Sequence, residues 1–407
     1  GEVVASGSMM NPQTQYGDDI MSRMKLEVDR DDGLATLNQA VVAGLDRLIA
    51  RVRRPGSVDP ADVFEATVVG TTTLHHRLLG ISTRGLSTVP FVPAVTGSLD
   101  VAAGDLGLAS IPSANVHVLP IAASFVGADA VGVTIAEEPH RQDDRVLIVD
   151  VGTNAELIAG NRHGLVCTST PTGPAFEGAH VEYGMRAADG ALERIQIDPD
   201  TLEPRYRVIG VPGWVTSGRE GEGKVKGICG SAIIDGVAEM FRTGIITQRG
   251  DFAEGLSTDR VREGDLGLEY VVARAEETSI GRDIPITLAD VRQIQLAKAA
   301  LYAAAHLLLR ELGISRPDRI VLAGAFGSQI DPTSAMLLGM IPDCPLERVH
   351  SVGNAAGDGA RIALLDRSKR AEALEVATSM RRLELPVDPD FQNEYLQAMN
   401  FPHMAHR

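Results

Sequence analysis

The stretch VLIVDVGTNAELIAG, residues 146–160, contains the pattern that decides the fold. Four apolar residues lead into Asp150, a tight turn follows, and a second strand-like run begins. This arrangement favours an anion-binding turn, because glycine lets the backbone approach a phosphate and successive amides in a turn bind anions. Thr153 and Asn154 add side-chain donors, and Asp150 is suited to hold a hydrated Mg²⁺ or to orient water. The alternative is an ordinary hairpin whose polar side chains satisfy their own turn.

Composition limits the class of protein to which this turn belongs. A chain of 407 residues predicts two domains, and 44% hydrophobic residues with 42 glycines are typical of an α/β protein. The net charge of −16 argues against nucleic acid and anionic membrane as partners, since phosphate binding needs a basic face. Three dispersed cysteines predict a reducing, cytoplasmic setting without disulfides. They also predict no iron–sulfur cluster or structural zinc in this chain.

Short apolar strands alternate with amphipathic helices along the sequence, which predicts an α/β fold. Apolar residues at steps of three and four predict a helix over residues 34–52. A second, long helix is expected over residues 286–313, begun by a capping box of Thr287 and Asp290 and ended by Gly313. The most polar segment, residues 137–145, is the predicted boundary between two lobes.

Three small-residue turns support a nucleotide site without proving one. LAGAFG (322–327) and VGNAAGDGA (352–360) each join a strand to a helix, and GICGSAIID (227–235) begins a helix. Such turns expose amides to phosphate or let a base lie on the backbone, although close helix–strand packing explains each one alone. Glu177, in the loop TGPAFEGAH, is placed either for a binding cleft or as a helix-start acid.

Eight motifs, in order and nearly end to end, resemble the reductive activators of corrinoid proteins. They are NPQTQYGDDIMSR, VVGTTTLHHRLLGI, VDVGTNAELIAG, TGPAFEGAHVEYGMRAA, GICGSAIID, QLAKAALYAA, VLAGAFGSQID and VGNAAGDGA. The resemblance implies two ribonuclease-H-like lobes of the acetate and sugar kinase/Hsp70/actin (ASKHA) type, with ATP and Mg²⁺ between them. It implies residues 1–140 as the first lobe, 141–367 as the second lobe and 368–407 as a C-terminal helix and tail. In this family, ATP use is linked to reduction of Co(II) corrinoid to Co(I), with the electron coming from a [2Fe–2S] ferredoxin domain.

The motifs and the resemblance together give a set of expected site residues. The catalytic candidates are Asp150 and Glu177, and Asp150 is also the candidate metal residue, through a Mg²⁺-bound water. The loop expected to face the partner contains Thr172, Gly173 and Phe176. The expected nucleotide-binding residues are Gly152, Thr153, Asn154, Gly230, Ser231, Gly324, Gly327, Gly353, Asn354 and Gly357.

Two departures from the family pattern affect these expectations. The cysteines of the ferredoxin domain are missing, so no [2Fe–2S] cluster is expected in this chain. The first phosphate hairpin is also missing, since Val68 stands in VVGTTT where that hairpin carries an Asp. We therefore expect a first lobe that is incomplete at its N-terminus, with an exposed or substituted edge strand. We expect weak or no ATP turnover from this chain alone.

The expected partners are a corrinoid protein and a ferredoxin-type electron donor, with a homodimer left open. Two other functions remain alternatives at this point. One is a small-molecule kinase of the ASKHA fold, which would phosphorylate a substrate without any partner. The other is a non-catalytic module that binds a protein partner and has a vestigial nucleotide cleft.

Overall fold

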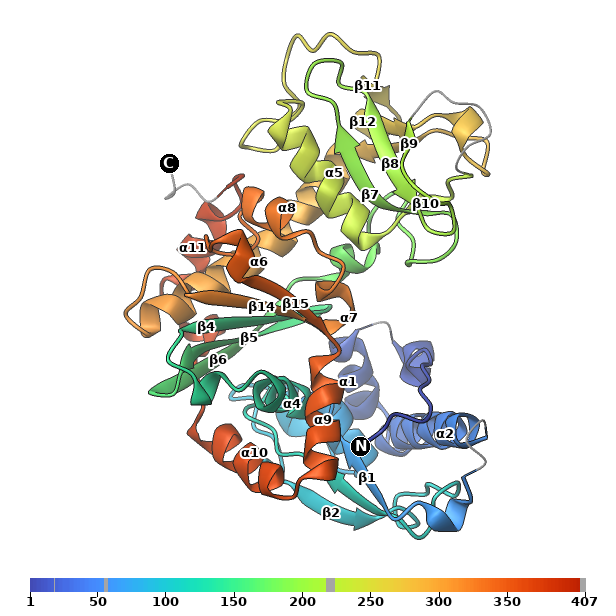
Figure 1. Ribbon diagram of the computed structural model, residues 1–407, viewed down its shortest axis with the longest axis vertical. Helices are drawn as coiled ribbons and strands as arrows, with labels where there is room; N and C mark the ends of the chain where they lie inside the picture. Colours follow the sequence, from blue (N-terminus) through green and yellow to red (C-terminus); the bar gives the residue numbers. More distant parts are fainter. Residues whose placement is uncertain (18, 55–57, 217–223, 403–407) are drawn as a thin grey trace. The chain divides into compact units, whose positions relative to one another are not determined.

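The computed structural model describes residues 1–17, 19–54, 58–216 and 224–402. Helices and strands alternate along these residues, which confirms the predicted α/β class (Figure 1). The chain divides into two compact units. The first unit comprises Gly1–Asp143, Gly160–Cys167 and Asn354–Arg382, and the second comprises Asp144–Ala159, Thr168–Gly353 and Leu383–Arg407.

The first unit contains a small three-stranded sheet in the order β1-β3-β2, with β1 parallel and β2 antiparallel to β3. Its strands are β1 (Glu65–Val68), β2 (Leu99–Ala102) and β3 (Asn115–Val118). Strand β1 is one edge of this sheet and is only partly buried, and an incomplete first lobe stays a prediction. The α-helices of this unit are α1 (Ile20–Asp29), α2 (Gly33–Arg53), α3 (Thr72–Leu78), α4 (Ala128–Glu137), α9 (Ala355–Leu365) and α10 (Ser368–Ser379). Short 3-10 turns are η1 (Pro12–Tyr16), η2 (Pro60–Asp62), η3 (Arg84–Leu86) and η4 (Pro139–Arg141).

Helix α2 confirms the helix predicted over residues 34–52. Its apolar stripe is buried, because Val41 and Val42 belong to one core cluster with Val116 and Val118 of β3. The stripe therefore covers the small sheet, as the spacing of its apolar residues predicts.

Helices α4 and α9 pack against each other with glycine at the contact (Figure 1). A Cβ on Gly359 would stand 2.0 Å from the carbonyl oxygen of Gly132, and a Cβ on Gly132 would stand 2.9 Å from that of Ala356. Real Cβ atoms do not approach oxygen so closely, so only glycine permits backbone contact between these helices.

The largest sheet has six strands in the order β15-β14-β4-β5-β6-β16. Strand β14 is parallel to both β4 and β15, and its residues Ile320–Ala323 are buried. Helix-covered parallel strands are buried on both faces, which explains their continuous apolar runs. The strands are β4 (Val146–Val151), β5 (Asn154–Asn161), β6 (Gly164–Pro171), β14 (Arg319–Ala323), β15 (Val349–Gly353) and β16 (Arg381–Arg382).

Two smaller sheets of the second unit lie beside helix α5 (Gly230–Arg242) (Figure 1). A Cβ on Gly236 would stand 2.4 Å from Ile286 Cδ1 and 3.2 Å from Ile195 Cδ1, so α5 packs closely on both sheets. The first sheet, in the order β10-β7-β8-β9, consists of β7 (Ala191–Ile197), β8 (Pro204–Val208), β9 (Val215–Thr216) and β10 (Gly227–Ile228). The second, in the order β11-β12-β13, consists of β11 (Val261–Gly264), β12 (Gly267–Ala273) and β13 (Ile284–Thr287).

The long helix α6 (Leu288–Glu311) has the ends that the sequence predicts. Thr287 and Asp290 form a capping box at its start, and Gly313 has φ +68° just beyond its end. The remaining helical segments of the second unit are η5 (Pro174–Glu177), η6 (Ala275–Glu277), α7 (Gly324–Gly327), α8 (Pro332–Leu337), η7 (Leu346–Arg348), η8 (Leu385–Val387) and α11 (Phe391–Gln397).

The segment that follows α11 folds back onto α6. The ring of Phe401 is fully buried, 5.3 Å from the Lys298 ammonium and 5.7 Å from the ring of Phe241. The Phe401 N–H donates to the carbonyl of Gln248 at 2.8 Å. The Phe401 contacts, together with hydrogen bonds from Gln295 Nε2 to the Met399 carbonyl at 2.7 Å and from Lys298 Nζ to the Asn400 carbonyl, hold this part of the chain in place.

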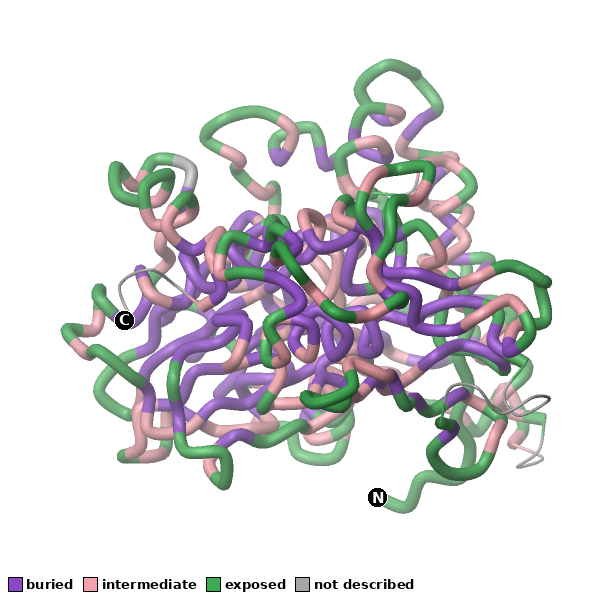
Figure 2. Tube along the Cα trace, turned by 90° about the horizontal axis from the view of Figure 1, so that it is seen from above, coloured by how far each residue is buried: buried purple, intermediate pink, exposed green. Residues whose placement is uncertain are grey.

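The surface of the described residues includes the whole N-terminal segment, since residues 1–10 are exposed (Figure 2). No helix in the described ranges combines the length and the apolar composition required to cross a bilayer.

Candidate functional site

Asp150 lies near the end of β4, as its position after an apolar run predicts. Strand β4 is hydrogen-bonded to β14, and Asp150 is opposite Ala323, the last residue of β14. The carboxyl ends of these two parallel strands meet at one edge of the sheet, where ligands of open α/β sheets bind. The turn after β4 and the glycine turn after β14 are therefore neighbours, although 170 positions separate them in the sequence.

The Asp150 carboxylate directly faces Gly324. A Cβ on Gly324 would stand 2.6 Å from Asp150 Oδ1, and Gly324 has φ +86°, so glycine is required on both steric and conformational grounds. Within the described part of the chain, no hydrogen bond or ion pair to this carboxylate is found, and burial raises the pKa of Asp150 to about 6. A partly buried carboxylate without a protein partner fits a hydrated divalent cation.

The turn of Gly152, Thr153 and Asn154 is held by the loop that follows β6. Thr172 Oγ1 donates to the carbonyl of Gly152 at 2.8 Å, and the N–H of Gly173 donates to the carbonyl of Thr153 at 3.1 Å. Thr172 and Gly173, two of the residues predicted to face a partner, thus hold the predicted phosphate turn in place.

The second predicted catalytic residue, Glu177, lies in the supporting loop and contacts this turn, whereas Asp150 lies on β4. Thr153 Oγ1 donates to Glu177 Oε1 at 2.7 Å, and Glu177 is exposed at the end of η5. Because the Thr153 hydroxyl proton is directed to Glu177, an oxygen lone pair of Thr153 remains for a water or a cation. Glu177 is therefore the carboxylate that orients this hydroxyl.

Phe176 is fully buried, although the loop around it was predicted to face a partner. Its ring stacks on Phe326 of the α7 turn, with centroids 6.0 Å apart and planes 11° from parallel. Its carbonyl oxygen is 1.7 Å from the position of a Cβ on Gly230. Phe176 and Thr172 thus contribute to packing, and a partner contact of the loop with Thr172, Gly173 and Phe176 stays a prediction.

The start of α5 is close to the same loop. The hydroxyl of Ser231, which was predicted to bind nucleotide, already donates a hydrogen bond within the protein. Gly230 contacts the carbonyl of Phe176 and the ring of Phe326. Ser231 Oγ donates to the carbonyl of Glu193 at 2.8 Å, and its side chain is buried. The role of Ser231 here is to fix α5 to β7.

The remaining predicted nucleotide-binding residues have no hydrogen bond to the turn after Asp150 among the contacts described for them. Gly327 lies in α7, and its carbonyl accepts a hydrogen bond from Ser351 Oγ at 3.5 Å. Gly353 ends β15 with φ +62°. Asn354 caps α9 by accepting the N–H of Gly357 at 3.0 Å, and both of these residues belong to the first unit. Their contribution to nucleotide binding stays a prediction.

Sequence reasoning missed a charge cluster around the buried side chain of Asp235. Asp235 of α5 forms an ion pair with Arg194 of β7, with Oδ2 2.8 Å from Nε, and Arg194 Nη2 lies 3.4 Å from Asp331 Oδ1. The available signal was an aspartate inside the apolar helix pattern GSAIIDGVAEM. A buried charge in such a position requires a partner.

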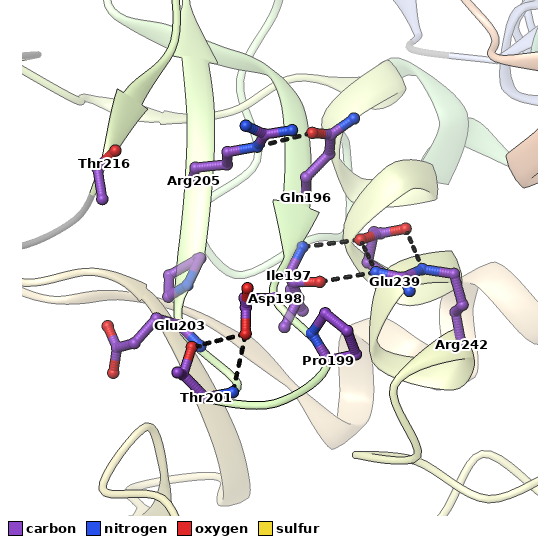
Figure 3. Close-up of a pocket in the computed structure, with 11 residues that line it drawn as sticks. Gln196, Ile197, Asp198, Pro199, Thr201, Glu203, Arg205, Thr216, Glu239 and Arg242 are labelled. Carbon is purple, nitrogen blue, oxygen red and sulfur yellow. Dashed lines mark hydrogen bonds and ion pairs between the residues drawn. The ribbon is translucent and has the colours of Figure 1, made fainter.

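A pocket of about 640 Å³ lies at the opposite end of α5, where Glu239 and Arg242 face the β7–β8 hairpin (Figure 3). Its polar groups already bind one another. Glu239 pairs with Arg242 at 2.7 Å, and Arg205 Nε donates to Gln196 Oε1 at 2.8 Å. Residues 231 and 239 are about 12 Å apart along the helix axis, so this pocket is separate from the turns around Asp150.

Comparison with known proteins gives matches along the whole chain. Residues 1–142 match the family model of the RACo middle region, and residues 144–407 match that of the C-terminal domain of RACo, the ASKHA domain. The chain is 32% identical over 403 residues to the corrinoid activation enzyme RamQ of Eubacterium limosum, covering 97% of this chain and 65% of RamQ. It is 25% identical over 306 residues to the [Co(II) methylated amine-specific corrinoid protein] reductase of Methanosarcina barkeri, covering 72% and 52%.

A solved structure of a reductive activator for corrinoid, iron-sulfur protein is also similar, with a TM-score of 0.84 and 34% identity. The match covers 97% of this chain and 61% of that structure. The chain thus spans between half and two thirds of the length of the proteins that it matches. Together with the family matches, this similarity shows that the chain belongs to the RACo family of corrinoid reductive activators and that its residues 144–407 form the ASKHA domain of that family.

Proposed function

We propose that this chain is the ATP-binding core of a reductive activator, which couples ATP to the reduction of Co(II) to Co(I) in the corrinoid protein of a methyltransferase system. The electron would come from a [2Fe–2S] ferredoxin domain outside this chain. Support comes from family membership and from relatives that are named for corrinoid activation and corrinoid protein reduction. The corrinoid protein is the substrate partner in this proposal.

The observation that carries the proposal is the Asp150 carboxylate, which has no protein partner among the described residues and faces the glycine turn after β14. In this position Asp150 would hold a hydrated Mg²⁺, and the turn of Gly152 to Asn154 would present backbone donors to phosphate. Gly324 would let the nucleotide approach the backbone. Bound MgATP would supply the phosphoryl groups whose hydrolysis drives the cycle.

Thr153 and Glu177 have a distinct task in this proposal. Their 2.7 Å hydrogen bond fixes the rotamer of Thr153 at the predicted phosphate turn. Glu177 is exposed and carries a negative charge, so it is suited to orient a water near the terminal phosphate. Catalysis of phosphoryl transfer depends mainly on such positioning.

The test measures Co(I) formation by the full-length gene product. The protein is mixed with a Co(II) corrinoid protein and a low-potential reductant, and the Co(I) absorption band is followed with and without ATP. We expect ATP-dependent Co(I) formation, lowered more than about tenfold by Asp150→Ala, because the Mg²⁺ position is lost. Asp265→Asn, which changes an exposed carboxylate of the β11–β12 hairpin, is the matched control.

The other outcomes separate the alternative functions. Co(I) formation that is independent of ATP would contradict the proposal. ATP consumption without any Co(I), accompanied by phosphorylation of a sugar or small acid, would establish the kinase alternative. Binding of a corrinoid protein that is unchanged in Asp150→Ala, with no effect of ATP, would establish a binding module.

A further inference from the structure

The charge cluster around the buried Asp235 side chain joins three elements of the second unit. Arg194 on β7 lies between two carboxylates, those of Asp235 on α5 and Asp331 before α8. Ser334 of α8 completes the cluster, since its Oγ is 3.1 Å from Asp235 Oδ1 and 3.0 Å from Asp331 Oδ2. The Asp235 side chain is 4% exposed, so its charge depends on these neighbours.

The cluster fixes the C-terminal end of the turn that follows β14. Residues 324–331, which we call the nucleotide turn, begin after β14 and end at Asp331, the N-cap of α8. The start of this turn is fixed by the sheet, where Gly324 faces Asp150. Its end is fixed by the contacts of Asp331 with Ser334 and Arg194. The cluster therefore determines where the end of the turn stands relative to α5.

We propose that Asp235 is a positioning residue for the nucleotide turn, which it holds through Arg194, Ser334 and Asp331. This inference rests on the proposed function, because that function makes residues 324–331 a nucleotide contact. Asp235 itself is buried, and in this proposal it acts through these neighbours. With Asp235 ionised, Arg194 and Ser334 are kept in the geometry that also contacts Asp331.

The protonation of Asp235 gives the inference a specific signature. Burial, followed by the negative charge of Asp331, raises the pKa of Asp235 to about 7, although the nearby Arg194 opposes the shift. The charged groups that face Asp235 are Arg194 from β7 and Asp331 from the start of α8. At pH 8 the carboxylate is ionised and pairs with Arg194, whereas at pH 5.5 it is protonated and resembles an asparagine.

The experiment compares Asp235→Asn with the unchanged chain. We expect the Kd for MgATP, measured by calorimetry, to be about three- to tenfold higher in the variant at pH 8, a size usual for coupling through packed side chains. The ratio of the two Kd values should fall toward one at pH 5.5. The other titrating groups are present in both proteins, so their effects on the two Kd values cancel in this ratio. A ratio of one at pH 8, or a ratio that does not change with pH, would overturn the inference.

A second measurement does not depend on nucleotide binding. Hydrogen exchange of the amides in residues 324–331 should be faster in Asp235→Asn than in the unchanged chain at pH 8, after correction for intrinsic rates. The matched control is Glu239→Gln, which removes a carboxylate–arginine pair from the other end of α5 and should leave these amides unchanged. Equal exchange in Asp235→Asn and the control would refute a positioning role.

Two further outcomes keep the inference separate from the proposed function. If the unchanged chain binds no MgATP, the proposed function fails, and the exchange result alone decides whether Asp235 positions the turn. If Asp235→Asn does not fold, Ser334→Ala takes its place, because it removes only the hydroxyl shared by the two carboxylates. Its exchange in residues 324–331 should then rise, and no rise would count against the inference.

Discussion

Asp150 combines a cost to stability with a role in the proposed reaction. Its carboxylate is partly buried near the carboxyl end of strand β4, and burial raises the pKa of Asp150 to about 6. Buried carboxylates without partners lower the stability of the folded state, and such strained groups are typical of functional sites.

We predict that Asp150→Asn stabilises the protein while it abolishes ATP use. Removal of the buried charge should raise the free energy of unfolding at pH 8 by on the order of 2 kcal/mol. The measurement is urea unfolding in EDTA, so that no cation binds the carboxylate. Asp265→Asn should leave the midpoint unchanged. A lower midpoint for Asp150→Asn would show that this carboxylate has a stabilising partner.

At this scale the sequence predicts which residue types bind a ligand but not which of them meet. Asp150 and Thr153 are recognisable from the turn after an apolar strand. The contact of Asp150 with Gly324 and the bond of Thr153 to Glu177 depend on tertiary packing. Burial of Phe176 was not predictable, because its partner Phe326 is distant in the sequence.

Helix α6 and the segment after α11 show how one element depends on another. Phe401 is fully buried, and its ring lies near the Lys298 ammonium of α6 and the Phe241 ring of α5. We predict that Phe401→Ala lowers the free energy of unfolding by about 3 to 5 kcal/mol, because it leaves a cavity that the backbone cannot fill. Urea unfolding followed by circular dichroism measures this change.

The matched control for this prediction is Leu396→Ala in α11. Leu396 is 58% exposed, so its loss should change the free energy of unfolding by less than about 0.5 kcal/mol. Similar effects of the two substitutions would mean that Phe401 contributes no more than a surface residue.

Elements with a strong local signal were predictable with nearly correct ends. Helix α6 has the expected capping box and terminal glycine, and α2 follows its apolar periodicity. Strand pairing was not predictable in the same way. The position of β14 between β4 and β15 comes from contacts between distant segments, which local patterns do not encode.

The whole molecule consists of two units whose segments alternate along the chain. Residues 160–167 and 354–382 belong with the N-terminal unit. A single boundary at a polar segment cannot predict that later segments of the chain pack in the N-terminal unit. Local composition carries no information about which distant segments pack together. Division of the chain into lobes at residues 140 and 367 stays a prediction.

Buried cysteines lie in both units, so thiol labelling can be compared between them. Cys167 lies in the first unit, whereas Cys229 and Cys344 lie in the second, and burial raises the pKa of Cys167 to about 12. We predict that MgATP slows thiol labelling of Cys229 and Cys344 more than that of Cys167, because a ligand stabilises the unit that binds it. Labelling followed by mass spectrometry measures each site.

Asp150→Ala is the control for this labelling experiment, since it should remove the effect of MgATP at Cys229 and Cys344. Equal slowing at all three thiols would mean that the molecule opens as one cooperative body rather than as two.

The backbone contact between α4 and α9 has an evolutionary consequence. Gly132 and Gly359 are far apart in the sequence, yet each provides the space that the other needs. A side chain gained at either position would have to be followed by a shift of a whole helix, which no single later substitution can supply. Among descendants of a common ancestor, these two positions should therefore be inherited as a pair of small residues, and lineages that lose one should be rare.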